Sequence, residues 1–394
     1  MNHTLSVATP KEVSTQEQVI VAKQISVKPL IVLGWEMLLA LPLGLILARF
    51  HIGGIAWIFG GLISGTVVLQ TYRVWGGYTP KPNRTARKTG MALVGLNVGF
   101  SVAHADLANV ASCFPVFAFL TFFLLLCGTL IGYIYSRLSK TNFLTAMLAT
   151  VPGGVGMMSA IAADYNKNVT LVALVQAIRV TSVVFLIPLV VRVLSGHQVY
   201  PQTLAIKTVL FSFDPSQLGL LLLALLFGSL GVYLAVLLKI PAGEFFGAIV
   251  AGIAFNPLLD SLPFIGDINF TLPPLVNIVG QMLLGITIGE YWGDKPTFGK
   301  RSIVYALMSV GMTLVAGGLA TILAMELTSW DWLTCLLVTA PGGSAEMILV
   351  ALTLHHNVEI VTAGHLVRLI AINSSLPIWV YLFRRLDNQL EEPT

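Results

Sequence analysis

The sequence predicts an all-α polytopic membrane protein made of two inverted repeats, with about ten transmembrane helices and two re-entrant or discontinuous Pro-Gly-Gly hairpins. Three observations predict this fold. Hydrophobic residues make up 56% of the 394 residues and charged residues only 10%, which is typical of helical membrane proteins. The stretch 150–188 aligns without a gap on 339–377. The basic residues of the loops also change sides between the two halves.

Each half contains six apolar segments. Those of the first half lie at about 30–48, 54–72, 89–105, 112–136, 141–165 and 169–192, and those of the second at about 217–238, 244–260, 273–291, 302–325, 331–354 and 358–383. We therefore expect a cytoplasmic N-terminal tail (1–29), membrane repeat 1 (30–195), an inter-repeat link (196–216), membrane repeat 2 (217–385) and a C-terminal tail (386–394). A period of this length indicates an internal duplication rather than a solenoid.

Loop charges predict that the halves have opposite orientations. The loop after the second segment holds five basic residues (Arg73, Lys81, Arg84, Arg87 and Lys88), and the loop after the third holds none. In the second half the loop after the ninth segment is basic, with Lys295, Lys300 and Arg301, and its neighbours carry only acids. Basic loops stay in the cytoplasm. We expect a multi-pass protein of the bacterial inner (plasma) membrane with both termini cytoplasmic.

Inversion requires an odd number of crossings in each half, so one of the six segments must enter and leave on the same side. The Pro-Gly-Gly segment is the candidate, because each arm of about 11 residues spans roughly 16 Å and reaches only the middle of a bilayer core of about 30 Å. Of the 22 basic residues, this arrangement leaves Arg49, Arg192 and Lys207 outside and two in the membrane. The alternative is a broken helix that crosses.

The hairpin tips are expected to bind a solute. Non-helical backbone at membrane depth occurs only inside the protein or beside a wet cavity, and amide groups at the start of the second arm favour an anion. The alternative is a kink that serves helix packing. The predicted tip residues are Thr150, Pro152, Gly153 and Gly154 in the first copy and Thr339, Pro341, Gly342, Gly343 and Ser344 in the second.

A lone arginine follows each hairpin near the middle of an apolar segment. Arg179 shares a helix face with Gln176, and Arg368 shares one with His365. A buried guanidinium needs a partner in the protein or a bound anion, and it suits carboxylate or phosphate. We expect these four residues to contact the substrate. The alternative is that each arginine binds carbonyl groups freed at the opposing hairpin tip.

Glu346 breaks the symmetry of the two copies, because Met157 holds the equivalent position. A carboxyl group at this depth is expected to titrate. We expect Glu346 to couple transport to an ion, and the alternative is a fixed ion pair with Arg368.

The duplicated T-x-P-G-G motif, followed by Asn-Val and an arginine, resembles the AbrB family of bacterial membrane proteins over about 30–385. Members carry old labels as regulators of gene expression or ammonia monooxygenases. The architecture is also similar to citrate and glutamate symporters, which have inverted five-helix repeats with glycine-rich re-entrant hairpins. That resemblance implies tip roles for Gly153, Gly154, Gly342 and Gly343, and a carboxylate ligand in Arg179 or Arg368.

These observations predict a secondary active transporter of a small, anionic organic solute, with elevator-like movement coupled to H⁺ or Na⁺. The alternative is a membrane-bound regulator or sensor that binds the solute without moving it. A membrane enzyme has least support, because no nucleophile–base pair or metal spacing occurs. We expect no enzymatic activity, cofactor, metal site or nucleic-acid partner. The expected partners are the solute, the coupling ion and the lipid bilayer, and we allow for a homodimer.

Overall fold

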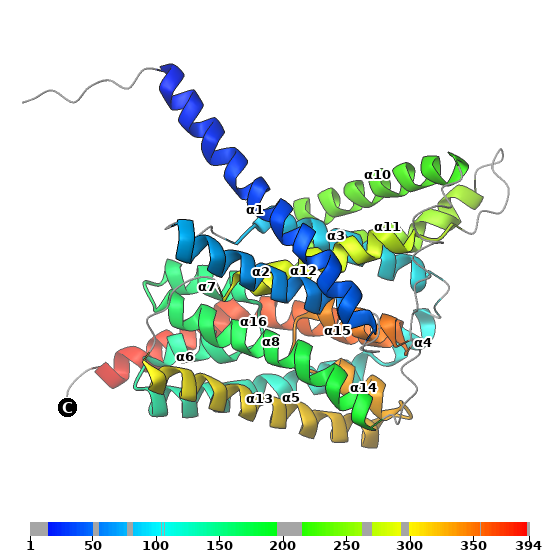
Figure 1. Cartoon of the computed structure of the whole chain (residues 1–394). Coiled ribbons are helices and arrows are strands. Elements are labelled where there is room, and N and C mark those ends of the chain that lie inside the picture. The colour runs from blue at the N-terminus through cyan, green and yellow to red at the C-terminus, as the bar shows by residue number, and fades with distance from the viewer. Residues whose placement is uncertain are drawn as a thin grey trace, which may run out of the picture.

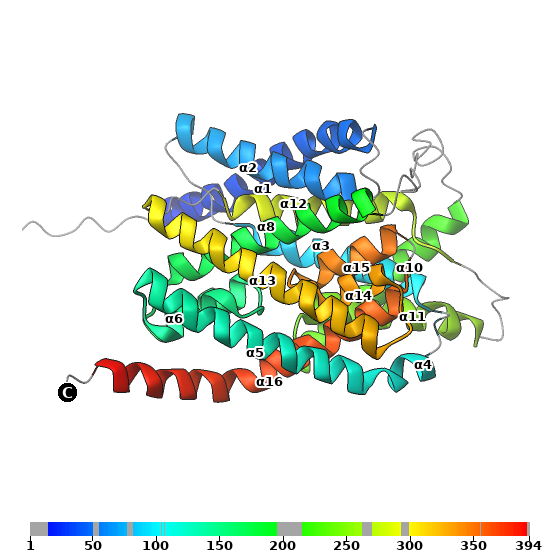
Figure 2. The ribbon, with the colours of Figure 1, turned by 90° about the horizontal axis from the view of Figure 1, so that it is seen from below.

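The structure is a computed structural model that describes residues 15–49, 55–76, 82–103, 105, 107–194, 215–261, 270–292, 299–354 and 356–391. The described residues form helices in two groups (Figures 1 and 2). The first group, which we call the scaffold bundle, packs the first three helices of each half together. It consists of α1 (Thr15–Arg49), α2 (Ala56–Gly76), α3 (Arg84–Ser101), α10 (Pro215–Leu237), α11 (Gly243–Asp260) and α12 (Pro274–Glu290).

The second group, the hairpin bundle, contains the two duplicated stretches. A short helix, α4 (Leu107–Ser112), leads into it. The bundle consists of α5 (Phe114–Ser139), α6 (Phe143–Thr150), α7 (Val155–Asp164), α8 (Val169–Leu194), α13 (Lys300–Leu327), α14 (Trp332–Thr339), α15 (Ser344–Thr353) and α16 (Val358–Glu391). It occupies the lower part of Figure 1, below α2, α3 and α12.

Six of the described helices are long and apolar enough to cross a membrane, and they lie within α1, α5, α8, α10, α13 and α16. The predicted membrane fold class is therefore confirmed, and the count of about ten crossings stays a prediction. Of the other expected crossings, α12 is apolar but has only 17 residues, and α3 carries Arg84, Arg87 and Lys88. The glycines of α2, α3, α11 and α12 let their backbones approach closely.

Glycine contacts hold the scaffold bundle together. A Cβ atom on Gly285 of α12 would lie 2.0 Å from the carbonyl oxygen of Ile58 in α2, and one on Gly99 of α3 would lie 2.3 Å from Ile249 O in α11. Gly90 of α3 lies against Leu283, and Gly280 of α12 lies against Val94. The helices α3 and α12, which are third in their halves, therefore run antiparallel, as inverted repeats require.

The two bundles meet along a mainly apolar surface. One buried cluster includes Ile58 and Val94 from the scaffold bundle and Val183 and Ile348 from the hairpin bundle. A hydrogen bond from Trp292 Nε1, just after α12, to Thr181 Oγ1 of α8 (3.0 Å) also joins described residues of the two bundles. A surface of this kind holds the bundles together without fixing them through many directional bonds.

Two expected domain limits differ from the helices. α1 begins at Thr15, inside the range assigned to the N-terminal tail, and α16 continues to Glu391, past the limit of 385. The second difference has a physical cause. Asp387 is buried and accepts hydrogen bonds from two backbone amides at the start of α6, Phe143 N (2.7 Å) and Leu144 N (3.1 Å). The end of α16 is therefore part of the packed structure.

We expect Gly285→Ala to lower the thermal stability of the purified protein, because the added methyl group would collide with backbone of another helix; overpacking of this kind costs about 1–3 kcal/mol. Gly311→Ala in α13 is the matched control, since nothing lies within 4 Å of its Cβ position, and alanine is the better helix former. Thermal unfolding in detergent measures both. Equal melting temperatures for the two variants would contradict the close helix contact.

Candidate functional site: two interrupted hairpins

The first interrupted segment folds back on itself. Asn142 caps the start of α6 by accepting from Thr145 N (3.0 Å). Lys167, which follows α7, lies 3.7 Å from the Asp387 carboxylate that also binds Phe143 N. Both ends of the segment therefore meet at one carboxylate. The segment folds back on itself in the structure, with Pro152-Gly153-Gly154 at its tip, and its re-entrant position in a membrane stays a prediction.

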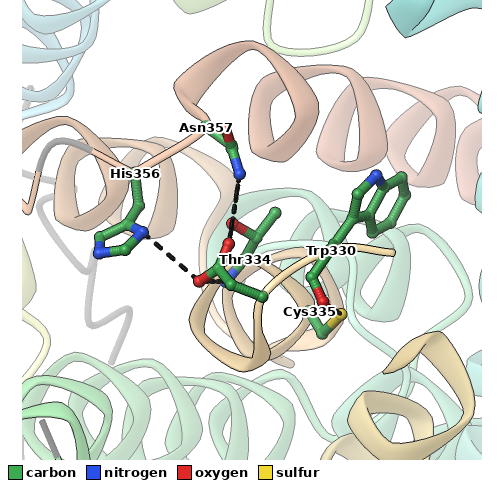
Figure 3. Close-up of polar contacts among 6 residues, drawn as sticks. Trp330, Thr334, Cys335, His356 and Asn357 are labelled. Carbon is green, nitrogen blue, oxygen red and sulfur yellow. Dashed lines mark hydrogen bonds and ion pairs between the residues drawn. The ribbon is translucent and has the colours of Figure 1, made fainter. Parts of the chain in front are cut away.

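The second segment forms a hairpin by a different set of contacts (Figure 3). Asp331 caps α14 by accepting from Thr334 N (3.2 Å). Asn357, which follows α15, donates from Nδ2 to Thr334 Oγ1 (2.9 Å) and to Asp331 Oδ1 (3.2 Å). His356 Nδ1 lies 3.4 Å from Asp331 Oδ2. These contacts join the end of the hairpin to its beginning and leave Pro341-Gly342-Gly343 at the tip.

The tips differ in backbone conformation. Gly154 has φ +84° and ψ 139°, a region that residues with a side chain rarely adopt. Its counterpart Gly343 has φ −71° and ψ 140°, which any residue can adopt. A Cβ on Gly343 would instead collide with the carboxylate of Glu346, which folds back over the tip. The duplicated glycines therefore serve different purposes in the two copies.

Arg179 and Gln176 bind the carbonyl groups that the first tip leaves without helical partners. Gln176 Nε2 donates to Leu148 O (2.8 Å) and Val151 O (2.9 Å). Arg179 Nη1 donates to Thr150 O (3.1 Å), and its Nη2 donates to Gln176 Oε1 (2.6 Å). Both side chains are buried. We call this pair the first clasp.

Arg368 and His365 form the second clasp. Arg368 Nη1 donates to Ala340 O (2.9 Å), and the hydrogen bond between its Nη2 and His365 Nδ1 is 2.6 Å long. Arginine has no acceptor, so Nδ1 must accept, and His365 Nε2 must donate to Leu337 O (3.0 Å). The imidazole is therefore neutral with its proton on Nε2, which makes it a match for the amide of Gln176.

The clasps bind their own hairpins. The alternative considered from the sequence placed each arginine on the opposing tip, and the hydrogen bonds place it on carbonyl groups of the hairpin that precedes it. Each clasp uses two guanidinium nitrogens of its arginine for protein groups. Direct contact between Arg179 or Arg368 and a substrate stays a prediction.

The two tips meet near the centre of the hairpin bundle. A cavity of about 10 Å³ lies between them, which is room for roughly one water molecule. Pro152 and Pro341 reach it from the two tips, together with Thr150 and Arg368, and α5 and α13 close its sides. Thr339 forms a hydrogen bond of 2.8 Å with Thr321 of α13 instead. The sequence thus correctly indicated that residues of both copies come together, but the tips leave no room for an organic solute between them in this conformation.

The cation that acts on Glu346 is not Arg368, the partner that the sequence offered as an alternative. Glu346 is buried and forms no salt bridge with Arg368; the cation that acts on it is Arg87 of α3. Arg87 Nη1 also lies 3.6 Å from the Cβ position of the exposed Gly156, near the start of α7. One scaffold arginine therefore lies beside the second arm of the first hairpin, and its charge acts on the carboxyl group in the second arm of the other. Ser344, the first residue of α15, is half-buried beside Glu346.

Arg87 was missed as a site residue because in the sequence it is one of five basic residues in a loop and at a helix start. No local motif separates it from Arg84 or Lys88. Only the packing of α3 on α15 brings it to the tips.

The described part of the chain holds no group of three or more histidine, cysteine, aspartate or glutamate side chains that could bind a metal ion.

The family model described as "Transition state regulatory protein AbrB" matches residues 57–384, which include both hairpins and both clasps. The chain belongs to the AbrB family. The resemblance inferred from the duplicated motif is thereby confirmed.

Two relatives match nearly the whole chain. "Uncharacterized protein YhjN" of Bacillus subtilis (strain 168) is 27% identical over 368 residues, which are 91% of this chain and 94% of that protein. "Putative regulator AbrB" of Escherichia coli (strain K12) is 26% identical over 349 residues, which are 86% of this chain and 94% of that protein. Neither description names a solute or an ion.

The duplication supplies a matched test of the clasps. We expect His365→Gln to keep the melting temperature close to that of the native protein, because glutamine makes the equivalent bonds at position 176. His365→Leu should lower it, since a carbonyl and a guanidinium N–H lose their partner at about 1–3 kcal/mol for each unpaired group. Thermal unfolding in detergent distinguishes the two. If both variants lose the same stability, the imidazole acts by packing alone.

Proposed function

We propose that this AbrB-family protein is a secondary active transporter of a small, anionic organic solute. In this proposal the solute binds at the hairpin tips, and the hairpin bundle moves relative to the scaffold bundle in an elevator-like manner, coupled to a proton or cation. The observation that carries the proposal is the meeting of two interrupted hairpins, one from each copy of the duplication, around a pair of buried arginines. Discontinuous helices paired in this way form the ion and substrate sites of many transporters.

Charge and exposure favour an anion at the first tip. The N-terminal end of α7 carries a partial positive charge, and Gly156 there is exposed. Arg87 lies beside it. The charge of Arg87 acts on the carboxyl groups of Glu244 and Glu346, but its guanidinium forms no hydrogen bond or salt bridge with any described residue. A guanidinium whose donors are not used by the described protein groups, beside a helix start, suits a carboxylate or phosphate. We propose Arg87 as the solute's main cationic contact, with Arg179 and Arg368 holding the tips around it and Glu346 as the coupling group.

The second arms of the two hairpins are buried to different extents, and this difference supports movement of one bundle against the other. α15 is almost completely buried, and it packs on α3 of the scaffold bundle. Its counterpart α7 has exposed residues along one side, including Gly156, Ala160 and Ala163. A pseudo-symmetric transporter with one covered and one uncovered hairpin is at one end of its cycle. Because the loop charges place the first hairpin on the cytoplasmic side, we propose that this end is inward-facing.

The alternative function is a membrane-bound regulator that binds the solute without moving it. The description of the E. coli relative as a regulator favours it. Solute-dependent stabilisation of the purified protein without flux in proteoliposomes would support the regulator and exclude the transporter.

Arg87→Ala tests the solute site. In a thermal-shift screen of organic acids and organic phosphates, we expect some compounds to stabilise the native protein and to bind Arg87→Ala about tenfold or more weakly, which is the value of a lost charge-assisted hydrogen bond. Arg84→Ala is the control, because Arg84 is exposed at the start of the same helix. Uptake of a compound found in this screen should be lower in proteoliposomes with Arg87→Ala than in those with the native protein, and Arg84→Ala should leave uptake close to the native rate. Unchanged binding by Arg87→Ala would remove this residue from the site.

Cysteine accessibility tests the movement. In a background with Cys113, Cys127 and Cys335 replaced by alanine, Ala160→Cys should react with a small maleimide, and its counterpart Leu349→Cys should be protected. A transported compound should slow the maleimide reaction of Ala160→Cys and speed that of Leu349→Cys. The reason is that movement would bury the first hairpin against the scaffold bundle and expose the second. Rates that stay fixed under conditions of measured uptake would exclude this movement.

A further inference from the structure

Glu36 is an acidic residue inside the most apolar part of α1. Its side chain is 0% exposed, and neither carboxyl oxygen has a hydrogen-bond partner among the described residues. α1 packs here against α2 and α12, and Ser64 of α2 bonds the backbone oxygen of Glu36, leaving the carboxyl group alone. An ionised carboxylate without partners at membrane depth is very costly. A buried carboxyl group of this kind must hold a proton or a bound cation that removes its charge.

A second carboxyl group acts on Glu36. Glu290, the last residue of α12, is 2% exposed and close enough to repel an ionised Glu36. Its Oε2 accepts a hydrogen bond from Asn83 N (2.8 Å). Two carboxyl groups in a shared low-dielectric site cannot both be ionised at low cost. Since Glu290 has a donor and Glu36 has none, the negative charge belongs on Glu290 and the proton on Glu36.

The charged groups of the surrounding helices do not neutralise the pair. On α2, the ionisable residues are Tyr72 and Arg73, and Arg73 donates to Gln70 (3.4 Å). On α12, Glu290 is the single ionisable residue, and α3 carries Arg84, Arg87 and Lys88, of which Lys88 is paired with Glu244. No described basic side chain forms a salt bridge with either carboxyl group.

The chemistry fits a proton better than a metal cation. Hard cations need six or more oxygen ligands, and the described residues around Glu36 and Glu290 supply no third carboxylate or imidazole. One proton on Glu36 removes the repulsion and needs no further ligand.

We propose that Glu36 is a proton-binding site in the scaffold bundle, which keeps its proton beside the ionised Glu290. Glu290 also lies between two polar groups of the scaffold bundle that face the hairpin bundle, Arg87 and Trp292. Through Asn83, which caps α3 by accepting from Ala86 N (3.0 Å), it holds the helix turn that bears Arg87. Two residues after Glu290, Trp292 bonds Thr181 of α8. Gain or loss of the proton would therefore act on both contacts. This link to transport rests on the proposed function, but the proton site does not.

Infrared spectroscopy of the purified full-length protein in detergent tests the site without any solute. At neutral pH the native protein should show the carbonyl stretching band of a protonated carboxylic acid, and the band should shift in D₂O. In a Glu346→Gln background, which removes the other buried carboxyl group expected to titrate, Glu36→Gln mimics the protonated group and should fold normally and lose this band. Glu244→Gln is the control in the same bundle, because Glu244 is ion-paired with Lys88 at 2.9 Å, and it should keep the band.

The pH dependence of the melting temperature is a second measurement, which applies if other bands overlap the carbonyl band. Raising the pH should lower the melting temperature of the native protein as Glu36 loses its proton inside the fold, and Glu36→Gln should remove this part of the pH dependence. Absence of the band at neutral pH, or its persistence in Glu36→Gln in the Glu346→Gln background, would overturn the proposal. Loss of the band on adding NaCl at constant pH would also overturn it, because the site would then hold a cation. A proton site without any flux in proteoliposomes would count against the proposed function alone.

Discussion

The hairpin bundle depends on one constraint: backbone groups freed by a break in a helix must find partners inside the protein, because lipid offers none. Pro-Gly-Gly frees carbonyl groups twice in this chain. On each occasion a long donor side chain on the next helix, Arg179 or Arg368, binds a carbonyl at the end of the first arm, and a neighbour one turn earlier, Gln176 or His365, binds another. The break and its clasp are one unit, which explains why they were duplicated together.

The two clasps solve the same problem with different chemistry. A primary amide and a neutral imidazole each present one donor to a carbonyl and one acceptor to the guanidinium, and so they are interchangeable in hydrogen bonding. The tips differ more, because Gly154 has a backbone conformation reserved for glycine and Gly343 makes room for Glu346. The pseudo-symmetry therefore holds for the clasping residues and for the Leu148 and Leu337 carbonyls, whereas Arg179 and Arg368 bind carbonyls one position apart in the two copies.

Much of the fold could be predicted from the sequence, and the reason is physical. The glycine-containing breaks, the lone arginines and their helix faces are local patterns, and each appears in the structure at the predicted residues. Long-range placement could not be predicted in this way. Arg87 reaches the tips only because α3 packs on α15, and the choice of each arginine for its own hairpin depends on how α8 and α16 lie against α6 and α14. Glu36 carried a signal that was missed, since an acid inside an apolar helix indicates a functional site.

The placement of Asp387 has a further mechanical meaning. α16 starts at the base of the second hairpin and ends with a carboxylate that fastens the base of the first. α16 is thus one helix that contacts both hairpins, so a displacement of one hairpin acts on the other through this helix. α16 therefore fixes the bases of the two hairpins relative to each other, through the start of the helix at one base and Asp387 at the other.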